Sequence, residues 1–286
     1  MLTEFPEEVR IPLAGWVNGL VDWMLLTFSD FFDGITTVVL WIILNTENIL
    51  MGIPWPIIIL TVIAGAWFST RSVLTTAVLA ALMFMIGSFG FWDLAMMTLA
   101  IIIAAVAISL CLGLPMGILV ARKESVATVV RPILDGMQTM PSFVYLIPAM
   151  MFFGLGKVPA VFATVVYAVP PLIRLTDLGI RGVVNSAIEA AESYGATPGQ
   201  ILKEVQLPLA LPAIMAGVNQ TTMMALAMVV IASMIGAAGL GQEVLLSINR
   251  IDAGRGAEAG LCIVALAIVI DRITQGFAKR YEESIA

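Results

Sequence analysis

The strongest constraint on what this 286-residue chain can fold into is a series of apolar segments, most of them close to bilayer length. A transmembrane helix needs about 20 mostly apolar residues. Hydrophobic residues make up 60% of the chain and charged residues only 12%, about half the charged share of a soluble domain. So many apolar side chains do not fit inside one water-soluble core. The sequence therefore predicts an all-α, polytopic membrane protein.

Seven segments are candidates for membrane helices, and prolines or glycines punctuate them. They cover residues 54–69, 72–90, 92–119, 133–154, 158–178, 209–235 and 258–278. The apolar stretch within residues 35–51 is too short to decide whether that segment crosses the bilayer. Residues 11–33 place Trp16, Leu20 and Trp23 near one helical face, which favours a helix in the membrane interface over a soluble packed helix.

The order of these segments divides the chain. Residues 1–33 are expected to form an interfacial arm, and residues 34–91 the accessory membrane helices. Residues 92–278 contain five of the candidate helices and form the predicted core. A polar loop at 185–208 interrupts that core, and residues 279–286 form a tail.

The basic residues predict the orientation in the membrane, because cytoplasmic loops carry an excess of Lys and Arg. If the spans alternate, one side collects most of them, including Arg71, Arg122, Lys123, Arg131, the basic residues between 181 and 203, Lys279 and Arg280. Only Lys157, Arg250 and Arg255 fall on the other side. The polar loop and the C-terminus are therefore expected in the cytoplasm.

Composition also excludes several functions. The chain carries 14 basic and 20 acidic residues, and it has no basic patch that would suggest nucleic acid. It has no histidine, so histidine-based catalysis and histidine metal ligands are excluded. Asp135, Asp177 and Asp271 fall near the ends of predicted helices, which argues against an intramembrane enzyme with paired carboxylates. We therefore predict neither catalytic nor metal-binding residues.

The polar loop predicts two short helices that meet at a corner. Ser186 and Glu189 have capping-box spacing, so a helix is expected to start at residue 187. Gly195 can end that helix in a left-handed conformation. Thr197, Pro198 and Gln200 then supply a second helix start. Pro208 is expected to end the second helix before the next membrane segment.

The same loop carries a specific motif. Glu189-Ala190-Ala191 is followed by three residues, Gly195, nine residues, and then Val205, Gln206, Leu207 and Pro208. This pattern resembles the EAA loop of ABC importer permeases, with Val205 in place of the usual isoleucine. The resemblance implies the type I ABC importer permease fold. Residues 135–149, 169–174, 206–220, 228–241 and 21–35 are in addition similar to the glycine betaine/proline, or osmoprotectant, branch of these permeases.

The resemblance implies several partners. These are two copies of a cytoplasmic ATPase, an extracytoplasmic substrate-binding protein, a second copy of this chain, and membrane lipid. ATP and magnesium would bind to the ATPase, because the only Gly-Lys pair here, Gly156-Lys157, is followed by Val158 rather than the Ser or Thr of a phosphate-binding loop. The residues implied in ATPase coupling are Glu189, Ala190, Ala191, Glu192, Gly195, Leu207 and Pro208.

A transport pathway is expected where polar and aromatic side chains interrupt the apolar segments. The candidates are Gln138, Thr139, Met140, Ser142, Phe143, Tyr145, Tyr167, Asn219, Gln220, Thr222 and Met223. Aromatic faces bind quaternary ammonium groups, and methionine gives a compliant lining. The competing interpretation is that these polar groups form hydrogen bonds between helices and that the rest are packing residues.

The resemblance thus implies an uptake permease in the cytoplasmic membrane of a bacterium or archaeon, which alternates access under the control of a separate ATPase. The expected cargo is glycine betaine, proline betaine, choline, carnitine or trimethylamine N-oxide. An ABC permease of another branch, for amino acids or sulfonates, is the main alternative. A passive channel is a further alternative, but it leaves the EAA loop unexplained.

Overall fold

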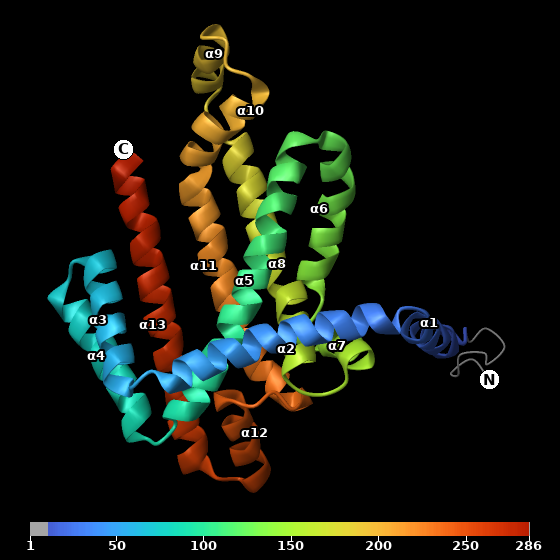
Figure 1. Cartoon of the computed structure of the whole chain (residues 1–286), viewed down its shortest axis with the longest axis vertical. Coiled ribbons are helices and arrows are strands. Elements are labelled where there is room, and N and C mark those ends of the chain that lie inside the picture. Colours follow the sequence, from blue (N-terminus) through green and yellow to red (C-terminus); the bar gives the residue numbers. More distant parts are fainter. Residues whose placement is uncertain (1–10, 286) are drawn as a thin grey trace, which may run out of the picture.

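The computed structural model describes residues 11–285, with side chains described as far as residue 277. Residues 1–10 of the expected interfacial arm lie outside the described residues. All regular elements in the described part are helices, as predicted. They form an elongated bundle with α9 and α10 at one end and α12 at the other (Figure 1). We call these the loop end and the α12 end.

The centre of the bundle consists of four long helices. These are α5 (Trp92–Arg122), α8 (Lys157–Arg181), α11 (Leu207–Ile231) and α13 (Ala253–Ile285). These helices are long and apolar enough to cross a membrane, α11 as part of the longer segment Pro198–Ile235 and α13 as far as Phe277. α8 packs most extensively against α5 and α11, so it lies at the heart of the core.

Small residues allow α8 to approach both neighbours closely. A Cβ added at Gly117 of α5 would lie 2.6 Å from the Cβ of Thr176 in α8. A Cβ added at Gly179 of α8 would lie 2.8 Å from the Cβ of Ala213 in α11. Membrane helices associate through such close contacts, because lipid gives them no hydrophobic reason to do so. The α5–α8–α11 unit is thus fixed by shape.

The prediction of one continuous helix over residues 133–154 is wrong. The chain instead forms α6 (Glu124–Thr139), the 3-10 helix η2 (Ser142–Tyr145) and α7 (Leu146–Phe153). The break lies at Met140, which has a ψ of 134° and precedes Pro141. Proline disfavours the helical conformation of the residue before it, so α6 ends there.

The N-terminal helices depart from the expected boundaries. α1 (Leu13–Thr27) and α2 (Ser29–Gly52) meet at Phe28, so the helix that includes residues 35–51 begins earlier than expected. Its 24 residues are long and apolar enough to span a membrane, yet α2 runs across the core helices rather than alongside them (Figure 1). α3 (Trp55–Thr70) and α4 (Val73–Ser88) are shorter, and they pack on α13.

The α12 end is closed by short elements. α11 continues into the 3-10 helix η4 (Ala232–Ile235), and a glycine-rich turn leads to α12 (Leu240–Arg250). Gly236 and Gly239 have φ values of 89° and 148°, which explains why glycine occupies both positions. The backbone N–H of Gly156, just before α8, donates to the carbonyl oxygen of Ile235 at 2.9 Å.

Candidate functional site

The loop at residues 185–208 projects from the bundle as the tip of the loop end (Figure 1). It begins with α9 (Asn185–Ser193), which has no buried residue. Gly195 follows with a φ of 84°, so the predicted left-handed corner is confirmed. Thr197 then caps α10 (Pro198–Gln200) in a full capping box with Gln200, as also predicted. The corner is set by local sequence alone.

Two local predictions for this loop are wrong. α9 begins at Asn185 after Val184, and no side chain caps it, so Ser186 lies inside the first turn rather than before it. Pro208 does not end a helix. The chain passes from α10 through the π-helical segment η3 (Ile201–Gln206) directly into α11, with Pro208 in the first turn of α11, where proline is tolerated.

The structure places most predicted coupling residues on one accessible projection. Glu189, Ala190, Glu192 and Gly195 are exposed, and Ala191 is half-buried. The neighbouring Tyr194 is 94% exposed, although the motif did not single it out. Leu207 and Pro208 lie at the base of the projection, where Leu207 packs against a small cluster around Ile180, Ala210 and Ile214. Such a projection presents a helix to a partner.

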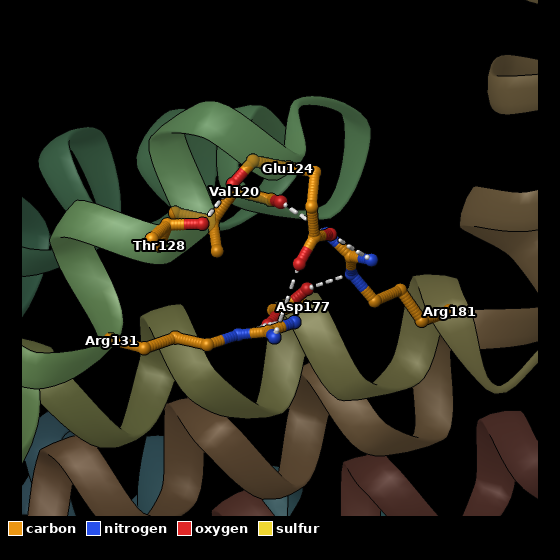
Figure 2. Close-up of polar contacts among 6 residues, drawn as sticks. All are labelled: Val120, Glu124, Thr128, Arg131, Asp177 and Arg181. Carbon is orange, nitrogen blue, oxygen red and sulfur yellow. Dashed lines mark hydrogen bonds and ion pairs between the residues drawn. The ribbon is translucent and has the colours of Figure 1, made fainter.

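A network of charged side chains lies at the base of this projection, and Figure 2 shows it. We call Glu124, Arg131, Asp177 and Arg181 the loop cluster. Arg131 of α6 donates from Nε and Nη2 to Oδ2 of Asp177, at 3.2 and 2.9 Å. Arg181 donates from Nε to Oδ1 of the same carboxylate at 2.7 Å. Asp177 thus binds two guanidinium groups from opposite sides.

Arg181 extends this network to a third helix. Its Nη1 lies 2.8 Å from Oε2 of Glu124, the first residue of α6. Its Nη2 donates to the carbonyl oxygen of Val120 at 2.8 Å, near the end of α5. Carbonyl groups in the last turn of a helix have no partner within that helix, and a guanidinium satisfies them well. Arg181 therefore joins α5, α6 and α8 (Figure 2).

A separate ion pair joins α6 and α8 farther from the loop. Arg174 of α8 binds Asp135 of α6; the Asp135 side chain is exposed, and that of Arg174 is half-buried. The contacts Glu124–Arg181, Arg131–Asp177 and Asp135–Arg174 therefore run in order along the two antiparallel helices. Only the first two contacts belong to the loop cluster.

Sequence reasoning missed the loop cluster as a functional feature. Arg131 and Arg181 were counted as basic residues that set orientation and Asp177 as an acidic residue at a helix end. Glu124 was not singled out. The available signal was the i,i+4 pair of Asp177 and Arg181 in an otherwise apolar segment. That Arg131, 46 positions from Asp177, would be its second partner could not be seen in the sequence.

The predicted pathway residues around the α6 break fall into two groups. Gln138, Thr139, Met140 and Phe143 are exposed on the surface of the single chain. Tyr145 is instead buried, and its hydroxyl donates to the carbonyl oxygen of Met137. The rings of Tyr145 and Tyr167 lie 5.8 Å apart, so they connect η2 to α8. Ser142, the first residue of η2, is half-buried.

Two residues of the polar run at 219–222 form hydrogen bonds between helices. Asn219 donates to Asp271 of α13 at 3.3 Å, and Thr221 donates to the carbonyl oxygen of Ala168 in α8 at 2.9 Å. Thr222 bonds within its own helix. Gln220 alone of the run is exposed, and Met223 is half-buried. Hydrogen bonds between helices therefore account for two of the four polar residues, and a pathway role remains a prediction.

At the α12 end, α8 carries a second ionic contact. Lys157, its first residue, pairs with Glu47 of α2. Both side chains are mostly buried, with 20% and 10% of their surfaces exposed. Lys157 follows Gly156, whose N–H binds η4. This Glu47–Lys157 pair ties the accessory helix α2 to the closed end of the core.

Comparison with known proteins places the chain among transport proteins. Residues 113–283 match the family described as binding-protein-dependent transport system inner membrane component. The chain is 47% identical over 272 residues to the glycine betaine/proline betaine transport system permease protein ProW of Escherichia coli (strain K12), covering 95% of this chain and 77% of ProW. It is also 47% identical over 270 residues to the glycine betaine transport system permease protein OpuAB of Bacillus subtilis (strain 168), covering 93% of this chain and 94% of OpuAB.

A solved structure shows the same fold. A chain of the MetNI methionine ABC transporter, in an inward-facing conformation, superimposes with a TM-score of 0.60 and 23% identity. The match covers 64% of this chain and 92% of that chain. The predicted type I importer permease fold is therefore confirmed.

Proposed function

The chain belongs to the family of binding-protein-dependent transport system inner membrane components, and on this premise we propose that it is the permease for glycine betaine, proline betaine or a related compatible solute. The observation that carries the proposal is the 47% identity to two permeases of this class over more than nine-tenths of the chain. The identity includes the accessory helices as well as the core, because the core alone is much shorter than the matched length.

The projecting loop supports docking of a separate ATPase. α9 offers a short helix without buried residues, and its acidic residues Glu189 and Glu192 are exposed. One loop in each permease would receive one ATPase subunit, so a complete transporter would hold two of each. ATP and magnesium would bind to the ATPase, and hydrolysis of the ATP would move the loop.

The exposed polar residues at the α6 break support a second copy of this chain as a partner. Gln138 and Thr139 precede Pro141, and Gln220 lies within a helix long enough to span the membrane. Lipid penalises such groups unless protein or a water-filled cavity covers them. In a homodimer with the pathway along the α6 break, the second copy and the water-filled pathway would cover these polar groups. Phe143 would then lie beside the solute.

The α12 end is the proposed docking face for the binding protein, and the loop end would face the cytoplasm. The turn between α5 and α6, the projecting loop and the C-terminus all lie at the loop end (Figure 1). Arg122, Lys123 and Lys203 belong to these segments, and such basic residues favour the cytoplasmic side. The multi-pass chain would then reside in the cytoplasmic membrane, with its C-terminus inside.

Transport would follow alternating access, in which ATP binding and hydrolysis bias two states of the permease pair. A direct test measures ATP hydrolysis by the complete transporter in proteoliposomes. The binding protein is offered glycine betaine, proline betaine, choline, carnitine or trimethylamine N-oxide. We expect one or two of the five to stimulate hydrolysis. A complex with basal hydrolysis and a flat response to all five would reject the osmoprotectant assignment, and uptake without ATP would indicate a channel.

A further inference from the structure

We propose that Asp177 is a positioning residue that makes α6 move as one unit with α8 and the projecting loop. The inference rests on the proposed function, since it concerns how an ATPase-driven movement of the loop reaches the pathway. Asp177 would not touch the solute or the ATPase. It would hold Arg131 and Arg181 together, so that a displacement of the loop also displaces α6.

The first argument is the position of the loop cluster in the chain. Only Gly182, Val183 and Val184 separate Arg181 from the start of α9. Any force on α9 therefore reaches Arg181 before it reaches another charged contact of the core. Arg181 then passes it to α5 through the Val120 carbonyl and to α6 through Glu124.

The second argument is the difference between the two helices attached in this way. α5 needs no ionic contact to follow α8, because Gly117 packs directly on Thr176. α6 has no such close packing. Its buried apolar contacts are a small cluster of Val120, Ala127, Leu134 and Ile173. The ionic contacts at its first two turns therefore decide where α6 lies relative to α8.

The third argument is where α6 leads. It ends at Met140, after the predicted pathway residues Gln138 and Thr139. A movement that keeps α6 fixed to α8 therefore carries these side chains with the core, while a loose α6 leaves them behind. The loop cluster connects the ATPase contact with the pathway through one helix of 16 residues.

Glu124 and Asp177 both contact the two cations, and Asp177 is the critical member because it is the more buried of these two carboxylates. Its side chain is 10% exposed, against 44% for Arg131 and 35% for Arg181. Removing a buried charge from a pair leaves its partners uncompensated, whereas solvent-exposed ion pairs contribute little. Without the Asp177 carboxylate, Arg131 and Arg181 would keep only the 68% exposed Glu124 as a carboxylate partner, at 3.9 and 2.8 Å.

The test compares Asp177→Asn with Asp135→Asn in the complete transporter in proteoliposomes. Both changes remove one carboxylate from the α6–α8 contact, but Asp135 lies outside the loop cluster and is 66% exposed. We expect Asp177→Asn to assemble and hydrolyse ATP while solute uptake per ATP falls about tenfold, a coupling loss of ordinary size. Asp135→Asn is expected to keep the wild-type ratio. An unchanged ratio in Asp177→Asn, or an equal loss in Asp135→Asn, would overturn the proposal.

Two further variants separate positioning from folding. Asp177→Glu keeps the carboxylate and is expected to recover more than half of the uptake per ATP. If Asp177→Asn does not assemble, Arg131→Gln takes its place, since it removes the contact of α6 with Asp177 but leaves the contacts of Arg181 with Asp177, Glu124 and Val120 intact. It is expected to lower the ratio, and a wild-type ratio would contradict the role of α6. Absence of ATP-driven uptake in the wild-type transporter would instead reject the proposed function.

Discussion

The two ends of α8 are held by ionic contacts of opposite kinds. At the loop end, Asp177 of α8 binds Arg131 of α6 and Arg181, and Arg181 also binds the end of α5. Most side chains of the loop cluster are partly exposed to water. At the α12 end, Lys157 has one buried partner, Glu47, on the accessory helix α2. The network at the loop end joins three helices through shared partners, whereas the buried pair joins only two helices and is either intact or lost. The comparison suggests that the loop end serves transmission and the α12 end serves anchoring.

The largest expected effect tests the anchoring role. Lys157→Met leaves the Glu47 carboxylate buried without a partner, so it should lower the free energy of unfolding by about 3–5 kcal/mol. Thermal unfolding of the purified protein in detergent measures this change. Adding Glu47→Gln to Lys157→Met removes the stranded charge and should recover most of the loss. Equal stability of Lys157→Met and the wild type would show that the pair does not anchor α2.

The next prediction tests whether α5 is held to α8 by shape rather than by charge. In Gly117→Ala, the added methyl group would meet Thr176 at 2.6 Å, so the helices must move apart. Overpacking of this kind costs about 1–3 kcal/mol, visible as a lower unfolding temperature. Gly136→Ala in α6 is the matched control, because nothing lies within 4 Å of its added Cβ. Similar losses in both variants would remove the distinction between α5 and α6.

A third prediction concerns the corner of the projecting loop. Gly195 has a φ of 84°, and a side chain in the left-handed region costs about 1–2 kcal/mol. Gly195→Leu should therefore reshape the loop and uncouple ATP hydrolysis from solute uptake. Gly199→Leu is the control, because Gly199 is also exposed and open but has no positive φ. Normal uptake in Gly195→Leu would sink the coupling role of this corner.

The smallest expected effect marks the limit of the loop cluster. Asp135→Asn breaks an ion pair whose side chains are 38% and 66% exposed, so stability should change by less than about 1 kcal/mol. Chemical denaturation of the purified variant measures this difference. A loss of unfolding free energy as large as that of Lys157→Met would mean that ion pairs hold α6 to α8 along the whole contact, and not only at the loop end.

The sequence was most informative where local chemistry decides the structure. Gly195, Thr197 and Gln200 predicted the corner of the loop, because capping and left-handed turns depend on neighbouring residues. The break at Met140 was missed although Pro141 was visible, because the apolar run on both sides of it is continuous. The extent of α2 was undecided for a related reason, because the apolar stretch within residues 35–51 is shorter than the helix that contains it.

The candidate site was less predictable, because its contacts join distant positions. Asp177 looked like a helix-end carboxylate until α6 supplied Arg131. Asn219 fitted a pathway equally well until α13 supplied its partner. The role of exposed residues such as Gln138 and Phe143 depends on the partner that covers them, and a single chain does not contain that partner.

The most direct test of the account is the distance between α6 and α8 during the transport cycle. Spin labels at Val129 and Leu178, both exposed, report it by electron paramagnetic resonance in a background without Cys111 and Cys262. We expect one unchanged distance before and after ATP binding in the wild-type transporter, and a broadened, nucleotide-dependent distribution in Asp177→Asn. A wild-type distance that shifts on ATP binding would contradict the claim that the loop cluster moves these helices together.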